Sequence, residues 1–434
     1  MNASAFLKEN GLDVESINRE ALLAAFIEEM EAGLAGRPSS LMMIPSFITS
    51  GKPVKTGKPV VVLDAGGTNL RAAIVSIDAN GKPAIGSFFK RPMPGTESEI
   101  TAEAFYEAFA DFLMPVIEAS ETIGFCFSYP AEILPDCDAR LIHWTKQIKV
   151  PSVVGTLIGS GLQEQLAKRG FKRKAVILND TVATLLAGKS AGVAKNYSTY
   201  VGFILGTGTN TSYIEQNSRI TKRRDLNPAE AQAINVESGG FGRVTQSVFD
   251  QAMDAQTNDC GRYAFEKMIS GAYLGRIGFE VLKAAAKKGL FSPSATAAIQ
   301  AWEGLSNLHL DDFCGGKPTP DNPFLANAFS PSDREQVKQL CTPVYARAAV
   351  LTAVNLASAI LKTGEGKDPK RPVCVNVDGS TYYKTLTADF QNRVQQELAA
   401  LLKPRGISYE LIKVDESPVI GAAVAGLMAA CECT

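Results

Sequence analysis

Two stretches of this chain share one pattern, in which a short apolar run, a glycine-rich turn and a second apolar run follow one another. Residues 60–63 precede the turn at 64–69, and residues 71–77 follow it. The same order recurs with residues 199–205, the turn at 206–210 and residues 211–215. Short runs with β-branched residues on either side of a glycine turn predict paired strands. Because the unit recurs at the scale of a domain, we expect two related α/β halves with a cleft between them.

The rest of the chain alternates between strand and helix patterns. Residues 60–190 predict three strands in a meander, then helix, strand, helix, strand and helix, whereas the second half contains more helix. We expect a small domain at 60–190, to which residues 415–434 return, and a large domain made of residues 1–59 and 191–414. The individual predictions are a third strand near 85–89, strands at 122–128 and 174–178, and helices at 11–36, 102–119, 181–188, 241–254, 264–288, 334–362 and 386–402.

Charge and composition limit the expected partners, the residues available for proton transfer and the expected location. The 434 residues have a net charge of −1, so neither nucleic acid nor an anionic membrane is an expected partner. With only two histidines, proton transfer is expected to fall to a carboxylate. The eight cysteines form no Cys-x-x-Cys pair, which favours a reducing compartment. No signal peptide is recognised, and the apolar run 419–430 is shorter than the ~20 residues that a spanning helix needs, so a cytoplasmic location is expected.

The two glycine turns favour phosphate as a ligand. Glycine lets backbone N–H groups approach an anion closely, and threonine adds a hydroxyl donor. Each turn alone is better explained as a tight hairpin, but two turns facing one cleft favour adjacent phosphates of a nucleotide. Asp64, at the end of its strand, would then suit a hydrated Mg²⁺. Arg71 remains open between a surface charge and a phosphate contact.

A second candidate lies where the strand at 174–178 ends. Asn179 and Asp180 follow this strand directly and precede a helix. Ligand crevices of α/β sheets lie at the carboxyl ends of strands, so Asp180 is expected to point into a site. The alternative is that Asp180 only caps the helix. Ordinary structural readings also exist for Ser128, for Lys146 in the stretch Trp144-Thr145-Lys146, for Glu237 before a glycine turn, and for Glu266 at the start of a helix.

Taken together and in order, these motifs resemble the hexokinase family, over residues 60–425. The resemblance implies an α/β fold of two actin-like (ribonuclease H-like) domains with a cleft between them, and ATP-dependent phosphorylation of a hexose 6-hydroxyl, glucose above all, with Mg²⁺. It implies that Asp180 is the catalytic base, with Lys146 beside it. By the same resemblance the sugar would be held by Ser128, Thr145, Lys146, Asn179, Asp180, Asn210, Glu237 and Glu266, and the nucleotide by Asp64, Gly66, Gly67, Thr68, Asn69, Arg71, Gly206, Thr207, Gly208, Gly379 and Ser380, with Asp64 serving Mg²⁺ through water.

The chain departs from the family pattern near its C-terminal end. The segment Asp415–Ala423 aligns with a stretch that usually carries Ser-Gly-Lys/Arg before Gly-Ala-Ala, but here Pro418 and Val419 stand in that region and no basic residue does. The only basic residue just upstream is Lys413. Two alternatives to a kinase are a non-catalytic sugar sensor and an actin-like ATPase. The presence of Asp180 argues against the sensor, and Glu237 and Glu266 argue against the ATPase.

Overall fold

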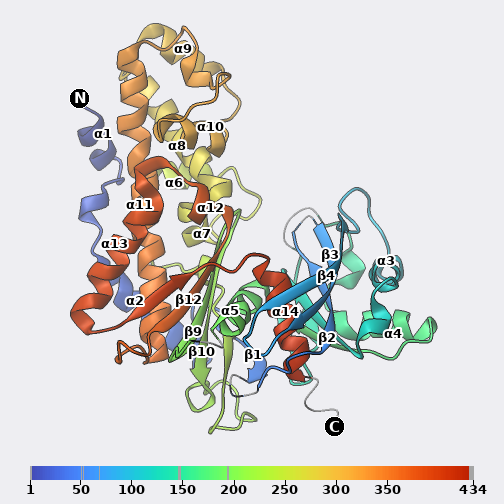
Figure 1. Ribbon diagram of the computed structural model, residues 1–434. Coiled ribbons are helices and arrows are strands. Elements are labelled where there is room, and N and C mark those ends of the chain that lie inside the picture. Colours follow the sequence, from blue (N-terminus) through green and yellow to red (C-terminus); the bar gives the residue numbers. More distant parts are fainter. Residues whose placement is uncertain are drawn as a thin grey trace.

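The computed structural model describes residues 2–49, 51, 53–67, 69–144, 148–192 and 195–429. The chain forms two lobes, each built around its own β-sheet (Figure 1). The smaller lobe lies to the right in this view. The larger lobe lies to the left and extends upward into a helical region.

The small-lobe sheet has the strand order β4-β3-β2-β5-β8. Strands β4 (Pro83–Pro92), β3 (Asn69–Ile77) and β2 (Pro59–Ala65) form the predicted antiparallel meander, and β5 (Thr122–Phe127) and β8 (Lys174–Leu178) continue it in parallel. Helices α3 (Ala102–Leu113) and α4 (Ile158–Lys168) cover one face, and α14 (Ser417–Ala429) covers the other. Each strand of the parallel part is buried on both faces, which explains its continuous apolar sequence. A short hairpin, β6 (Ala131–Ile133) and β7 (Ala139–Leu141), was not predicted.

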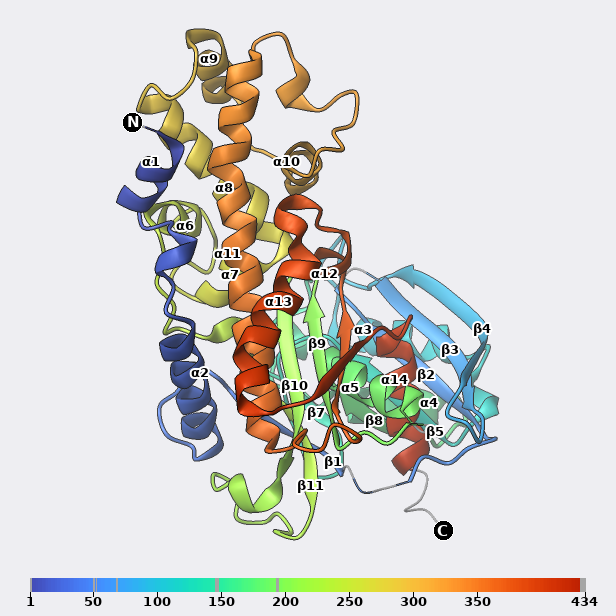
Figure 2. The same ribbon diagram turned by 60° about the vertical axis from the view of Figure 1, so that its left-hand side comes forward.

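The large-lobe sheet has the order β1-β11-β10-β9-β12-β13. Strand β9 (Thr199–Leu205) has the predicted bounds, and β10 (Thr209–Gln216) begins two residues before the predicted start. Helix α5 (Asp180–Ala191) packs against this sheet and also against α14, so it lies between the lobes (Figure 2). The strands β1 (Ile44–Thr49), β11 (Ala231–Asn235), β12 (Val373–Asp378) and β13 (Tyr409–Ile412) complete the sheet.

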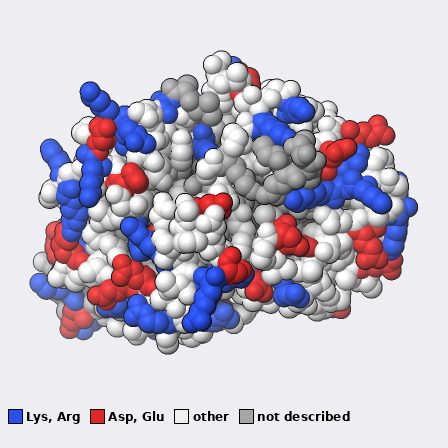
Figure 3. Space-filling model, turned by 90° about the horizontal axis from the view of Figure 1, so that it is seen from below, with Lys and Arg blue, Asp and Glu red and all other residues white. Residues whose placement is uncertain are grey.

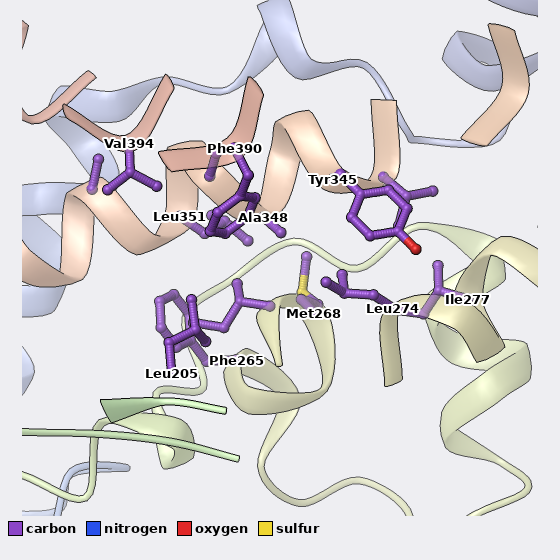
Figure 4. Packing of buried hydrophobic residues seen from close by; sticks show 14 of the residues in the cluster. Leu205, Phe265, Met268, Leu274, Ile277, Tyr345, Ala348, Leu351, Phe390 and Val394 are labelled. Atoms are coloured by element: carbon purple, nitrogen blue, oxygen red, sulfur yellow. The ribbon is translucent and has the colours of Figure 1, made fainter. Parts of the chain in front are cut away.

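A large helical core stands above this sheet. Its long central helix α11 (Pro331–Thr363) packs on α2 (Arg19–Leu34), α8 (Gly271–Lys287) and α13 (Phe390–Leu402). Figure 4 shows Phe265 and Met268 of α7 (Ala264–Ile269) packed with Leu351 and Ala348 of α11. The remaining helices are α1 (Ala3–Glu9), α6 (Val248–Asp254), α9 (Pro293–Ala301), α10 (Asn307–Cys314) and α12 (Ser380–Lys384), with single 3₁₀ turns at Val14–Ser16, Ile117–Ala119, Pro151–Val153, Asn217–Arg219, Ser238–Gly240, Pro323–Leu325, Thr387–Asp389 and Lys403–Arg405.

Helix α11 is long and apolar enough to cross a membrane by length and composition, but 94% of its most apolar window is buried inside the protein. Burial of this kind is what a core helix requires, because its apolar surface is already covered by other helices. Helix α14, at the apolar run predicted from residue 419, is shorter and is buried between α5 and the small sheet.

Several predicted helices were wrong in extent. The helix predicted at 11–36 begins only at Arg19, after a short 3₁₀ turn. The helix predicted at 241–254 begins only at Val248, because Ser247 and Asp250 form a capping box that fixes its start. The helix predicted at 264–288 is divided at Ser270, whose backbone is extended. The helix predicted at 102–119 ends at Leu113 before a short 3₁₀ turn.

Helices α5 and α14 touch backbone to backbone at one point. A Cβ atom on Gly421 would lie 1.7 Å from the carbonyl oxygen of Ala183, so the two backbones are in direct contact. Nearby, Asn376 of β12 donates to the carbonyl of Thr184 at 2.7 Å and to the hydroxyl of Ser417 at 3.0 Å. The large sheet is thereby tied to both helices. The domain boundaries expected at residues 60, 190 and 415 stay predictions.

Candidate active site

Three neighbouring parallel strands of the small lobe end at one edge of the sheet. In the register, Asp64 lies beside Cys126, and Cys126 lies beside Leu178. The residues at or just after these strand ends are Asp64, Ser128 and the pair Asn179-Asp180. Because parallel strands run in the same direction, these side chains gather at one edge, as the sequence predicts.

Asn179 and Asp180 divide two roles at the start of α5. Asn179 is the N-cap residue, and its side chain accepts hydrogen bonds from the amide and hydroxyl of Thr181 at 2.8 and 2.6 Å. Asp180 is the first residue of the helix and is only partly buried. Capping is therefore done by Asn179, which leaves the Asp180 carboxylate available to a ligand. A carboxylate at this position is also stabilised by the helix dipole.

A network of amides connects this edge to the large lobe. The Asn210 side-chain amide donates to Asn235 at 2.8 Å and to Glu237 at 3.2 Å, and lies 3.4 Å from the Asn179 oxygen. Asn235 also donates to the Glu237 carboxylate at 2.8 Å. Three predicted sugar ligands, Asn179, Asn210 and Glu237, are thus brought together. Asn235, which was not among the predicted ligands, orients two of them.

Glu237 is held in an unusual state. Its backbone is left-handed, with φ of 56°, which costs free energy for a residue with a side chain and is typical of functional sites. Burial raises the pKa of Glu237 to about 7, and the negative charges of Asp180 and Glu266 act in the same direction, whereas the hydrogen bond from Asn235 opposes them. A carboxyl group with this pKa is poised to accept hydrogen bonds from hydroxyl groups that replace its lost water.

Glu266 reaches the same cluster from helix α7. Its Oε2 accepts a hydrogen bond from the backbone amide of Thr209 at 2.9 Å. A Cβ atom on Gly208 would lie 2.6 Å from this oxygen, and one on Gly239 would lie 3.1 Å from the Glu266 Cβ. The glycines at 208 and 239 are therefore needed so that the glutamate can approach the turn. The packing of Phe265 and Met268 on α11 fixes the helix that carries it (Figure 4).

The second glycine turn, at residues 206–210, accepts hydrogen bonds from the start of α8 and from α12. Gly271 at the start of α8 donates its amide to the carbonyl of Gly206 at 2.9 Å, and the Thr381 hydroxyl donates to the same carbonyl at 2.8 Å. Gly379 has φ of 106°, and a Cβ there would lie 2.3 Å from the carbonyl of Leu205. The break in the predicted helix 264–288 thus has a purpose, because it presents the first amides of α8 to this turn.

A cavity of about 350 Å³ lies between the first glycine turn and the segment after β12. It meets the sugar-side cluster at Asp180, which lines the cavity and also influences Glu237 electrostatically. Of the predicted residues, those that line it are Asp64, Gly66, Gly67, Asn69, Arg71, Ser128, Asp180 and Gly379. Its other lining residues are Ile204, Asp378, Glu416 and Pro418.

Asp64 and Arg71 form a close pair in this cavity. They are opposite each other in the β2–β3 register, and Arg71 Nη1 lies 2.6 Å from Asp64 Oδ2. The Asp64 side chain is 1% exposed and that of Arg71 is 29% exposed. Burial raises the pKa of Asp64 despite the opposing charge of Arg71. Arg71 is therefore not a free surface charge, since it pairs with a buried carboxylate, and its contact with phosphate stays a prediction.

Several predicted ligands do not line this cavity, and others lie outside the residues that the structure describes. Thr68, Thr145 and Lys146 lie outside the described residues. Trp144, just before two of them, donates its indole N–H to the carbonyl of Val150 at 2.7 Å and contacts the ring of Tyr129. The residues that do not line the 350 Å³ cavity are Gly206, Thr207, Gly208 and Ser380 on the nucleotide side, and Asn179, Asn210, Glu237 and Glu266 in the sugar-side cluster.

Two carboxylates in the cavity were not among the predicted ligands. Asp378 is the last residue of β12, as Asp64 is the last but one of β2, a signal that the sequence did offer. Burial raises the pKa of Asp378, and the charges of Asp180 and Glu416 add to the rise. Glu416 precedes α14 within the segment that departs from the family pattern. Lys413 pairs with Asp415 at 2.6 Å and faces the ring of Tyr383, and it does not line the cavity. It therefore does not supply the missing basic residue there.

The arrangement is that of a phosphotransferase site, with a polar cluster suited to a polyhydroxylated acceptor on one side and glycine turns suited to phosphates on the other.

Comparison with known proteins agrees with this class of site. Two models of the family described as hexokinase match residues 3–190 and 200–428. Hexokinase-1 of Oryza sativa is 31% identical over 83% of this chain and 77% of its own length, and Hexokinase-1 of Schizosaccharomyces pombe is 29% identical over 93% and 86%. The solved structure of a Schistosoma mansoni hexokinase complexed with glucose has a TM-score of 0.81 and 26% identity over 98% of both chains.

The chain belongs to the hexokinase family. Its two-lobed α/β architecture is that of these relatives, and the fold class predicted from the sequence is confirmed. The individual roles of the site residues stay predictions, which the geometry above makes specific.

Proposed function

We propose that this protein transfers the terminal phosphoryl group of Mg²⁺-bound ATP to the 6-hydroxyl of a hexose, with glucose as the main acceptor. The observation that carries the proposal is the position of Asp180. It lines the phosphate cavity and belongs to the same electrostatic cluster as the sugar-side Glu237. A group at this junction can touch both the acceptor hydroxyl and the transferring phosphoryl group.

The sugar-side cluster accounts for recognition of a polyol. Glu237 and Glu266 offer carboxylate oxygens, while Asn179, Asn210 and Asn235 supply amide groups that are already oriented by mutual hydrogen bonds. A buried polar group that loses its partner costs ~1–3 kcal/mol, so a sugar with one hydroxyl inverted is disfavoured. Glucose in the complexed Schistosoma mansoni structure supports this assignment.

Asp180 accepts the proton of the attacking hydroxyl in this proposal. Phosphoryl transfer depends mainly on in-line positioning and on neutralising charge, and a carboxylate that takes the alcohol proton completes the requirement. The capping role of Asn179 leaves Asp180 free to do so. Lys146 would stand near the reacting oxygens, as the family resemblance implies.

The residues of the phosphate cavity fit a hydrated Mg²⁺. Asp64, Asp180, Asp378 and Glu416 line it, whereas among the described lining residues Arg71 is the only cation. Within the described parts of the chain, no cluster of three or more acidic, histidine or cysteine residues could cage a metal on its own. Mg²⁺ prefers this situation, since it keeps several waters and binds through one or two carboxylates and the substrate phosphates. Bound Mg²⁺ supplies charge neutralisation on the phosphate oxygens.

A coupled assay for glucose 6-phosphate with glucose and Mg²⁺-ATP tests the proposal. Asp180→Ala should lower kcat by ~10²–10⁴-fold, because general-base catalysis contributes that much, while glucose binding by calorimetry changes little. Asp321→Asn, at an exposed aspartate that does not line the phosphate cavity, is the control and should retain full activity. A wild type that binds glucose without turning over any of glucose, mannose or fructose would overturn the kinase proposal in favour of a sugar sensor.

A further inference from the structure

A cavity of about 900 Å³ lies in the small lobe, away from the site described above. It is lined by the residues at the starts of β2, β5 and β8 and by the last turn of α14. These parallel strands run from this cavity toward Asp64, Ser128 and Asn179 at their other ends. At ~3.3 Å per residue, strands of this length separate the two edges by about 20 Å.

The lining of this cavity is strongly basic. Lys55, Lys58, Lys172, Arg173 and Lys174 contribute five cationic side chains, against the two carboxylates of Glu118 and Glu121. Figure 3 shows the underside of the molecule, where Lys and Arg side chains are spread over both lobes and are mixed with Asp and Glu. The net charge of the whole chain is only −1, so this concentration of positive charge is local.

Three of these cations have no carboxylate partner. Among the described residues, no ion pair within 4.0 Å involves Lys58, Lys172 or Arg173. By contrast, Lys168 pairs with Glu103 at 3.3 Å, and Arg169 pairs with Asp111 at 2.5 Å, only a few residues upstream. The same part of the small lobe therefore neutralises Lys168 and Arg169 outside the cavity, whereas Lys58, Lys172 and Arg173 inside it have no carboxylate partner among the described residues.

The guanidinium of Arg173 is held in position without being neutralised. Its Nε donates to the carbonyl of Ile117 at 3.1 Å, its Nη1 donates to the carbonyl of Lys172 at 3.0 Å, and its guanidinium lies 5.3 Å from the ring centre of Phe171. A cation fixed in this way loses little side-chain entropy when it binds an anion.

We propose that this basic cavity is a second ligand site, which binds a small organic molecule bearing two or more phosphate groups. Arg and Lys together recognise phosphate oxygens through charge-assisted hydrogen bonds. A volume near 900 Å³ is at the upper end of small-molecule sites, which range from about 300 to 1,000 Å³, so a single inorganic phosphate would fill little of it. Several separated cations match several phosphate groups.

The position of this basic cavity connects it to the movement of the lobes. Lys55 and Lys58 lie on the chain segment that passes from β1 of the large sheet to β2 of the small sheet. Helix α14 reaches from Pro418 in the phosphate cavity to Gly426 and Leu427 in the basic cavity. An anion that ties Lys58 to Lys172 and Arg173 fastens this connection to the small lobe, and it therefore changes the affinity for the hexose.

Titration calorimetry with tripolyphosphate in EDTA tests the site without turnover. In the wild type we expect binding that weakens as salt increases. In the double variant Lys58→Glu/Lys172→Glu this binding should weaken at least ~tenfold, because two charge-assisted contacts become repulsive. Both lysines are exposed, so the fold should be retained, and Lys58→Gln/Lys172→Gln gives a milder version if it is not.

The matched control is Lys287→Glu/Lys288→Glu, which changes the net charge by the same amount at the exposed end of α8. It should bind tripolyphosphate as the wild type does. Equal losses in the two double variants, or no loss in either cavity variant, would overturn the site. The link to lobe movement is tested by measuring the KM for glucose at saturating Mg²⁺-ATP, with and without tripolyphosphate. Tripolyphosphate should change this KM in the wild type and in the control, but not in the cavity variants. A wild-type KM that tripolyphosphate does not affect would overturn the link.

Discussion

The sugar-side cluster and the phosphate cavity sit next to each other but are built on opposite principles. The sugar-side residues Asn179, Asn210, Asn235 and Glu237 hydrogen-bond one another before any ligand arrives. In the phosphate cavity, four carboxylates face one described cation, Arg71, so the cavity favours a bound cation such as Mg²⁺. The first region is organised by geometry, and the second is organised by the charge of what it binds.

The largest expected effect tests the charge side of this comparison. Arg71→Ala should lower the free energy of unfolding by about 3–5 kcal/mol, because it leaves the buried Asp64 without its partner. The loss should be smaller at pH 5 than at pH 8, since Asp64 can take up a proton. Urea unfolding measures both. Arg243→Ala removes an exposed pair with Glu28 and should cost no more than about 1 kcal/mol. Equal losses in the two variants would contradict the importance of the buried pair.

The next largest effect is the pH dependence of stability that Glu237 causes in the sugar-side cluster. The pKa of Glu237 is about 7 in the folded protein against an ordinary value of 4.5, so the folded protein binds more protons than the unfolded chain between these values. The stability that this proton contributes is present below pH 4.5 and is lost as the pH rises through 7, a change on the order of 3 kcal/mol. Unfolding of the sugar-free protein across this range measures it. In Glu237→Gln, the pH-dependent loss of stability should be smaller than in the wild type by about 3 kcal/mol. If the free energy of unfolding of the variant depended on pH as that of the wild type does, the raised pKa would be contradicted.

The same glutamate should control sugar affinity. Glu237→Gln replaces a charged acceptor by a neutral amide and should raise the Kd for glucose by ~10–100-fold, in line with the ~1.5–3 kcal/mol of a hydrogen bond to a charged group. In the wild type, affinity should fall as the pH drops below 7, because the sugar hydroxyls favour the ionised form. Calorimetry measures both, with exposed Glu303→Gln as the matched control. An unchanged Kd would remove Glu237 from the sugar site.

The smallest effect tests how tightly the geometry is set. Gly208→Ala places a methyl group against Glu266 Oε2, which must then move away from the Thr209 amide. We expect KM for glucose to rise several-fold, at a cost of about 1 kcal/mol, with little change in stability, because the end of a flexible side chain can shift. Gly304→Ala, where an added methyl group meets nothing within 4 Å, should leave KM unchanged. A KM equal to that of the wild type in Gly208→Ala would show that Glu266 tolerates displacement.

The regular elements of the fold were largely readable from local pattern, and the exceptions were set by distant contacts. Strand β9 and the meander of the small lobe follow from apolar runs and glycine turns. The break at Ser270 could not be inferred from periodicity, because it serves hydrogen bonds from Gly271 to Gly206, far away in the sequence. Strands β1 and β13 lie at the edges of their sheet and carry weaker patterns.

The candidate site shows the same division. Residues at strand ends, such as Asp64, Asn179 and Asp180, were found because the position itself is informative. The sequence also marked Glu237 and Glu266, but only the structure shows that Asn235 orients Glu237 and that Arg71 faces inward to Asp64. Glu416 was missed because its place in the cavity depends on how α14 returns to the small lobe.

The bare contact between Gly421 and Ala183 has a mechanical consequence. At this point no side chain separates the two helices, so a displacement of one backbone must displace the other. Since α5 begins at Asp180, any shift of α14 along its axis is felt at the reacting end of the molecule. The two helices are therefore expected to move together at this contact.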